Sequence, residues 1–206
     1  FANVDTEQPR FLEFERWWSG FYFMNEGEMR WLVENLFVGN RLARGGAQLD
    51  SRMHVDLRNI RAPVIVFASH GDNITPPTQA LNWISDAYSN VQEIKARGQR
   101  IVYTVHESIG HLGIFVSGGV AKKEHQEFAS NIDLIDVLPP GLYEAVLTPA
   151  AADKAHPERV TGDWIARFEP RTLNDIRDIV KPDPENERRF AAVRRVSEIN
   201  LGMYRT

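Results

Sequence analysis

The hydrophobic pattern is clearest where a short apolar run passes through a turn into a helical repeat. Val64 to Ala68 are apolar and rich in β-branched residues, which is typical of a strand buried on both faces of a parallel sheet. Gly71 then supplies a tight turn, and Thr75 followed by Pro76 suits the start of a helix. The apolar residues of that helix recur at helical spacing: Leu81, Ile84 and Tyr88. Asp72 is therefore predicted to lie at the carboxyl end of a strand, just before a helix.

A second unit of the same kind follows. Arg100 to His106 is rich in strand-forming residues and predicts another strand, which ends in a loop that carries His111. A polar helix is expected to follow Gly118 and Gly119. Two consecutive strands thus deliver Asp72 and then His111 to one edge of one sheet, the edge where ligands bind in open α/β sheets. We expect an α/β fold in which parallel strands are flanked by helices.

The amino-terminal segment is dense in aromatic residues. Several of them share one side of a possible helix: Phe14, Trp17, Trp18 and Phe21. Such a surface suits a lid over an acyl-binding pocket, although the same spacing is more typical of ordinary core. Asn25 and Glu28 have the pattern of a capping box, and an amphipathic helix is expected to continue as far as Gly39. We interpret residues 1–46 as a helical segment that caps the edge of the sheet where Asp72 and His111 are expected.

The pattern changes again after residue 138. Prolines and a glycine interrupt it at 139–141, and residues 149–157 have the composition of a linker. Asp183 followed by Pro184 favours a helix start, and an apolar seam then runs among arginines: Phe190, Val193, Val196 and Ile199. We expect residues 47–138 to form the core, and 139–206 to form a linker and a helical appendage that packs or self-associates rather than binding lipid.

Composition bounds the remaining possibilities. The chain has 206 residues, 43% of them hydrophobic, and a net charge of −4, which fits one domain or one with an appendage. The mildly acidic, interspersed charge lacks the basic face that nucleic acid requires, and no apolar run approaches the ~20 residues of a transmembrane helix. The sequence has no signal peptide, and a cytoplasmic location is expected. Because it opens at Phe1 rather than at a methionine, we expect a piece of a longer protein.

Asp72 and His111 are the candidate catalytic pair. A carboxylate that stabilises an imidazole needs this pairing, and in α/β-hydrolases the chain order is nucleophile, acid and then histidine. Each residue also has a structural interpretation: aspartate is common in turns, and a loop histidine can be satisfied by backbone groups. The order of the pair and its position at successive strand ends favour catalysis.

Other chemistry is less well supported by the sequence. His70 and His106 lie close enough to the pair that all four residues could hold a metal ion, but their spacing matches no recognised ligand pattern. The glycine pair before the predicted helix lacks a P-loop lysine and a dinucleotide-binding pattern. We therefore expect no metal and no cofactor. No serine occupies a G-x-S-x-G elbow, Ser117 follows the histidine, and the chain has no cysteine, so the nucleophile is not in this sequence.

Several motifs carry a family resemblance. The segment from Asp56 to Pro77 resembles the penultimate strand and acid loop of α/β-hydrolases. More narrowly, GNRLARGG at 39–46, GDNITPP at 71–77 and GHLGIFVSGG at 110–119 resemble the carboxyl half of polyhydroxyalkanoate synthases and a related uncharacterised bacterial family. The resemblance covers roughly residues 10–130. It implies a Cys-Asp-His triad with an upstream cysteine, hydroxyacyl-coenzyme A as donor and a growing polyester as acceptor.

We therefore expect the carboxyl-terminal half of an α/β-hydrolase-type acyltransferase that is inactive by itself. The expected partners are the substrate, either hydroxyacyl-coenzyme A or an ester, and the missing amino-terminal half of the same protein. A second copy is the alternative cover for the open sheet edge, in a homodimer. Two other functions remain open: an esterase or polyester depolymerase on the same fold, and a non-catalytic binding or granule-assembly module.

Overall fold

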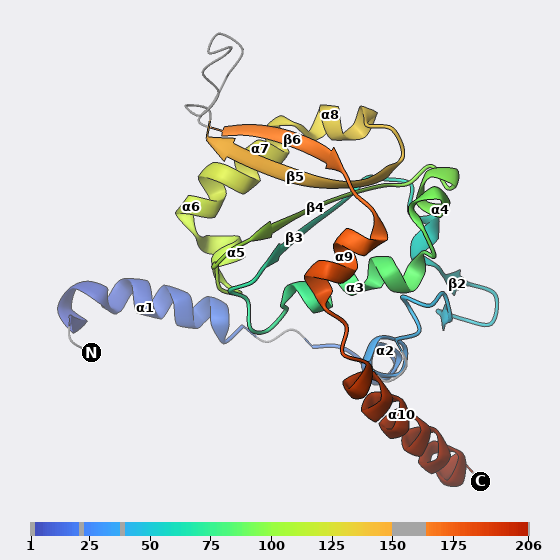
Figure 1. Cartoon of the computed structure of the whole chain (residues 1–206). Coiled ribbons are helices and arrows are strands. Elements are labelled where there is room, and N and C mark those ends of the chain that lie inside the picture. The colour runs from blue at the N-terminus through green and yellow to red at the C-terminus, as the bar shows by residue number, and fades with distance from the viewer. Residues whose placement is uncertain (1–2, 21–22, 38–39, 150–163, 206) are drawn as a thin grey trace.

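The computed structural model describes residues 3–20, 23–37, 40–149 and 164–205. Its centre is a four-stranded sheet in the order β3, β4, β5, β6 (Figure 1). The strands span Val64–Ser69, Arg100–His106, Gly141–Pro149 and Trp164–Pro170. β3 and β5 both run parallel to β4, whereas β6 pairs antiparallel with β5. A two-stranded antiparallel ribbon, β1 (Ala47–Gln48) and β2 (His54–Val55), lies outside this sheet.

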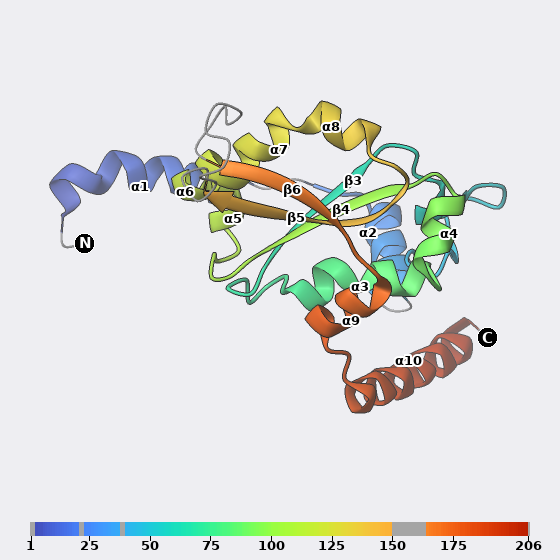
Figure 2. The ribbon, with the colours of Figure 1, turned by 45° about the horizontal axis from the view of Figure 1, so that its top comes forward.

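Helices cover both faces of the sheet (Figures 1 and 2). One face carries α3 (Pro77–Ala87) and α9 (Leu173–Val180), with α4 (Val91–Ala96) at its end. The other carries a chain of short helices: α5 (Gly113–Val116), α6 (Gly118–Val120), the π-helical turn η3 (Ala121–His125), α7 (Gln126–Ser130) and α8 (Ile132–Val137). This layered arrangement confirms the predicted α/β class, with parallel strands and flanking helices.

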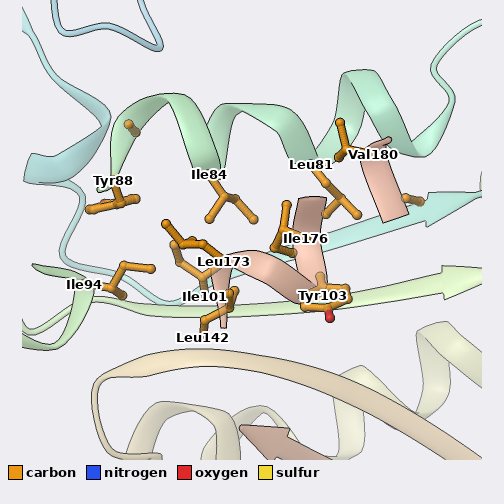
Figure 3. Close-up of a cluster of buried hydrophobic side chains, with 12 residues drawn as sticks. Leu81, Ile84, Tyr88, Ile94, Ile101, Tyr103, Leu142, Leu173, Ile176 and Val180 are labelled. Atoms are coloured by element: carbon orange, nitrogen blue, oxygen red, sulfur yellow. The ribbon is translucent and has the colours of Figure 1, made fainter. Parts of the chain in front are cut away.

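The main core lies between the sheet and the helix pair α3 and α9 (Figure 3). The predicted helical repeat points into it, because Leu81 and Ile84 are fully buried and Tyr88 is 1% exposed. Ile176 of α9 packs into the same cluster and is also fully buried. A smaller core on the opposite face surrounds Ile135 of α8.

The sheet continues past the boundary that the sequence suggested. Residues 139–206 were expected to be a linker and a helical appendage, but they contribute β5, β6 and α9 to the sheet and to its core. The prolines and glycine at 139–141 precede β5 rather than ending the domain. Most of the predicted linker at 149–157 falls outside the described residues. The helical part of the expectation holds for α9 and for α10 (Pro184–Arg205), none of whose residues is buried.

The amino-terminal segment is helical, as expected, but its described aromatic residues do not form core; Phe21, which was predicted to share their side, lies outside the described residues. It comprises α1 (Val4–Trp18), α2 (Glu26–Leu32) and the π-helical turn η1 (Val33–Phe37), followed after the ribbon by a 3-10 turn, η2 (Leu57–Asn59). Asn25 and Glu28 form the predicted capping box. Trp17 and Trp18 are each 60% exposed and contact other aromatic rings of α1. Because α1 lies away from the sheet, these rings pack on one another and not on the sheet (Figures 1 and 2).

Candidate active site

Asp72 lies in the loop that joins β3 to α3, and its two carboxylate oxygens have different partners. Oδ1 accepts hydrogen bonds from the backbone N–H groups of Ile74 and Thr75, each at 2.9 Å. Oδ2 accepts a hydrogen bond of 2.7 Å from the Thr75 hydroxyl and lies 2.9 Å from Nδ1 of His111. The residue is only 2% exposed. The structure therefore brings the two predicted catalytic residues together.

The charge of Asp72 sets the tautomer of His111. Burial raises the pKa of the Asp72 carboxyl, but hydrogen bonds from the Thr75 backbone, the His111 ring, the Thr75 hydroxyl and the Ile74 backbone outweigh it, so the pKa lies well below its usual 3.8. At neutral pH the carboxylate is ionised and can only accept hydrogen bonds. Nδ1 of His111 must then carry a proton and donate a hydrogen bond to Asp72, so that in the neutral ring the lone pair is on Nε2.

The His111 side chain is partly exposed to solvent. Its loop joins β4 to α5, and its side chain is 30% exposed while that of Asp72 is fully buried. Nδ1 also lies 3.1 Å from the Thr75 hydroxyl oxygen, which gives the ring a second contact on its buried side. A general base requires an imidazole whose Nδ1 is held by a carboxylate and whose ring is accessible to the reacting group.

The loops that carry Asp72 and His111 are packed directly against each other. Strands β3 and β4 end at the paired residues Ser69 and His106. The buried Ser69 hydroxyl donates to the Ile109 carbonyl at 2.6 Å and accepts from the Gly71 N–H at 3.1 Å. A Cβ placed on Gly71 would lie 2.2 Å from the Ser108 carbonyl oxygen, so there is no room for a side chain. Ser69 and Gly71 therefore fix the separation of the two loops.

Comparison with known proteins places the chain in a family. The family model described as "Protein of unknown function (DUF3141)" matches residues 1–206. This chain belongs to the DUF3141 family. A relative from Rhizobium meliloti, "Uncharacterized protein in ackA 5'region", is 62% identical over 206 residues, which are 100% of this chain but 28% of that relative. The chain therefore spans less than a third of the curated relative's length. No solved structure matches it.

These matches bear on the resemblance that the motifs suggested. They assign the chain to DUF3141, and the names of the family and of the relative mention neither a polyhydroxyalkanoate synthase nor a hydrolase. The finer assignment thus stays a prediction. No helix in the described part of this DUF3141 chain is long and apolar enough to cross a bilayer.

An exposed apolar surface adjoins the Asp72–His111 pair in this DUF3141 chain. Ile74, next to the acid, is 60% exposed, and Phe115 and Val116 on α5 are 71% and 72% exposed. The Phe115 ring lies edge-on to the His111 ring, with 6.5 Å between ring centroids. Large apolar side chains beside a candidate base suit an apolar ligand or a covering segment of protein.

His70 and His106, the other two residues of the candidate metal site, have partners of their own. His106 turns toward its own loop, where Nδ1 accepts hydrogen bonds from Ser108 and Ile109. His70 contributes a backbone N–H to the His106 carbonyl at 2.9 Å, continuing the strand pairing. The described residues contain no group of three or more side chains that could hold a metal ion.

Sequence reasoning missed two residues that support the site. Thr75 was interpreted as part of a helix start, but Pro76 occupies the N-cap position of α3, and the Thr75 hydroxyl contacts both Asp72 and His111 instead. The available signal was a threonine three residues after an aspartate, a spacing at which the aspartate side chain bonds local backbone and hydroxyl groups. Ser69 carried no comparable signal, because its partner Ile109 is 40 residues away.

An apolar hollow of about 390 Å³ lies along β3, away from the pair. Its lining includes residues from β3, from α3 and from the segment that runs from η1 to η2: Leu36, Leu42, Leu57, Val64, Val66 and Trp83. Among the described residues, β3 pairs only with β4, so its other edge is unpaired.

Proposed function

We propose that Asp72 and His111 are the acid and the base of an α/β-hydrolase-type acyl-transfer site, and that the nucleophile comes from another part of the longer protein. The observation that carries this proposal is the 2.9 Å contact between Oδ2 of Asp72 and Nδ1 of His111 at the ends of adjacent parallel strands. The His111 side chain is 30% exposed while Nδ1 faces the buried Asp72, which supports an Nε2 that a reacting group can reach. The Asp-then-His order agrees with that of α/β-hydrolases.

A purely structural role explains only half of the Asp72 contacts. A turn aspartate needs one oxygen to accept local backbone N–H groups, and Oδ1 does this for Ile74 and Thr75. Oδ2 is not required for the turn, yet it is buried and directed at His111. Thr75 donates to that same oxygen and thereby fixes the orientation of the carboxylate. An orienting role for Asp72 explains this second set of contacts.

The proposed reaction proceeds in two transfers. Nε2 of His111 takes the proton of the nucleophile, which attacks the acyl carbonyl of a thioester; the bond to sulfur breaks, and the departing thiolate takes the proton from Nε2. An acyl-enzyme results. The hydroxyl group of the acceptor then gives its proton to Nε2 and attacks the acyl carbon, and the bond to the nucleophile breaks as the proton returns to it. Asp72 stabilises the imidazolium in both transfers.

The unpaired edge of β3 supports a contribution from outside the chain. Val64–Ser69 carries no charge or proline, the features with which exposed edge strands avoid pairing. The apolar hollow along this strand gives an added strand a surface to cover. The relative's much greater length supplies the polypeptide for it. We propose that the rest of the same protein pairs with β3; a second copy of this chain is the alternative occupant.

The apolar side chains beside His111 support an acyl substrate. Ile74 and Val116 are exposed near the pair in sequence, and the exposed Phe115 ring lies against the His111 ring, so a substrate at His111 would meet hydrocarbon. By resemblance to the synthases, the donor is a hydroxyacyl-coenzyme A and the nucleophile a cysteine. A simple ester and water would use the same acid and base, with serine as nucleophile.

The test compares thiol release from hydroxyacyl-coenzyme A with hydrolysis of a short nitrophenyl ester by the complete protein. Asp72→Asn is expected to lower kcat by about 10⁴-fold, because the amide favours the wrong tautomer of the histidine, and His111→Ala by a similar factor. His54→Ala is the matched control, since His54 is exposed on β2 and its side chain hydrogen-bonds only to Gln48 among the described residues. Turnover of the ester alone would favour the esterase. Unchanged turnover in Asp72→Asn and His111→Ala would refute the site.

A further inference from the structure

A second histidine holds the loop that presents the first. His106 is the last residue of β4, and its Nδ1 accepts hydrogen bonds from the backbone N–H groups of Ser108 at 3.1 Å and Ile109 at 3.2 Å. A ring nitrogen that accepts two N–H donors carries no proton itself. The neutral ring therefore has its proton on Nε2, which is the opposite tautomer to that of His111.

The other side of the His106 ring faces a buried carboxylate. Nε2 lies 3.9 Å from Oε1 of Glu124, a residue of the π-helical turn η3 that is 3% exposed. Lys123 binds the same oxygen at 3.1 Å, and its ammonium group lies 4.6 Å from the centre of the Trp164 ring on β6. The negative charge facing Nε2 favours the proton on that nitrogen, and so keeps Nδ1 free to accept.

The backbone of Ile109 is consequently held from both sides. Its N–H donates to His106, and its carbonyl accepts from the buried Ser69 hydroxyl at 2.6 Å. Ser108, whose N–H also binds His106, has its carbonyl packed against Gly71 in the acid loop. The two residues so fixed precede His111 by two and three positions, so their placement sets where its ring meets Asp72.

From these contacts we infer that His106 is a positioning residue: its unprotonated Nδ1 fixes the backbone at Ser108 and Ile109 and thereby holds His111 against Asp72. His106 does not touch the reacting atoms. The inference about His111 placement stands on the contacts above, whereas its effect on turnover rests on the proposed function. Removal of the acceptor should release the loop and weaken the Asp72–His111 hydrogen bond without changing either residue.

Two substitutions separate the acceptor from the rest of the side chain. Asparagine carries Oδ1 where histidine carries Nδ1, so His106→Asn keeps an acceptor for the two N–H groups. His106→Leu fills comparable space without one. In the complete protein, His106→Leu is expected to abolish the low-field NMR signal of the His111 Nδ1 proton and to lower kcat by about 10²-fold with little change in KM, as misplaced catalytic groups do. His106→Asn should retain the signal and most of the activity.

The tautomer of His106 can also be measured directly, without a variant, from its two ring nitrogens. Their ¹⁵N shifts in the unaltered protein should report the Nε2–H tautomer; a proton on Nδ1 would overturn the inference. So would a His106→Leu protein that keeps the His111 signal, or a folded His106→Asn protein that loses it as fully as His106→Leu. If the unaltered protein shows no turnover, the proposed function fails, while the NMR signals still decide the role of His106.

Discussion

Substitution of Gly71 by alanine is the sharpest test of how the site is assembled. The added Cβ would lie 2.2 Å from the Ser108 carbonyl oxygen and 2.8 Å from that of Ile109. Both neighbours are backbone atoms of the loop that carries His111, so neither can move as a flexible side chain would. The contact with Ser108 must open by about 0.8 Å, from 2.2 Å to at least 3.0 Å, the closest approach that real Cβ atoms show.

That displacement is large compared with the distance by which the Asp72–His111 hydrogen bond can lengthen before it breaks. The distance from Nδ1 of His111 to Oδ2 of Asp72 is 2.9 Å, and hydrogen bonds of this kind extend to about 3.2 Å. Gly71→Ala should therefore break the bond by displacing His111 from Asp72, although neither of these two residues is itself substituted. Misplacement on this scale costs about 10²-fold in rate. The assay is kcat of the complete protein together with the low-field NMR signal of the His111 Nδ1 proton.

Gly110→Ala is the matched control, because a Cβ at Gly110 meets nothing within 4 Å among the described residues, although it adjoins His111. It should keep both the NMR signal and the activity. A Gly71→Ala protein that retains the signal and the activity would refute the packing of the two loops on which the site depends.

Three further predictions test the charge, the core and a buried hydroxyl. Because the pKa of Asp72 is lowered in the folded state, its contribution to stability is present above about pH 4 and is lost as pH falls toward the folded pKa; Asp72→Asn should flatten the fall of unfolding free energy between about pH 4 and pH 2, and an unchanged slope would contradict this. Ile176→Ala should lower the free energy of unfolding, measured in urea, by about 2–5 kcal/mol. Ile199→Ala on exposed α10 should lower it by under about 0.5 kcal/mol; equal losses would exclude α9 from the core. Burial raises the pKa of Tyr88 to about 12, and its hydroxyl has no hydrogen-bond partner among the described residues; Tyr88→Phe should therefore leave stability within about 1 kcal/mol of the parent, against a loss of about 3–5 kcal/mol for Tyr88→Ala.

The elements that carry the site were predictable from short-range pattern. The apolar run at Val64–Ala68 and the strand at Arg100–His106 each appear where they were expected, and Asp72 and His111 follow from their positions at the strand ends. The parallel ladder then brings the two loops together without further information from the sequence. Local pattern sufficed because each element is specified by its own residues.

Strand β5 was missed because it is buried on both faces and therefore has no alternating pattern. Gly141 to Tyr143 are all buried, and Ala145 is buried after them. Glu144 interrupts this run with a charge that argues against a central strand. The structure tolerates it because Arg171 binds its carboxylate at 2.8 Å. That partner lies 27 residues away, so no local pattern predicts it.

The environment of α1 and of Thr75 also depended on contacts that periodicity does not encode. The aromatic spacing of α1 indicated a helix with an apolar side but not the surface, if any, that covers it. Thr75 has a side chain that can cap a helix or bind a carboxylate, and only the position of His111 selects the second role. In both cases the residue type allowed two outcomes and the tertiary structure chose between them.

Trapping of an acyl-enzyme tests the central claim most directly. The complete protein is mixed with hydroxyacyl-coenzyme A, quenched in acid and measured by intact mass spectrometry, alongside its His111→Ala and His54→Ala variants. The account predicts one added acyl group on the unaltered protein and on His54→Ala, released by hydroxylamine and absent from His111→Ala. A protein that gains no acyl group and releases no thiol, or a His111→Ala variant that acquires the group as readily as the parent, would contradict it.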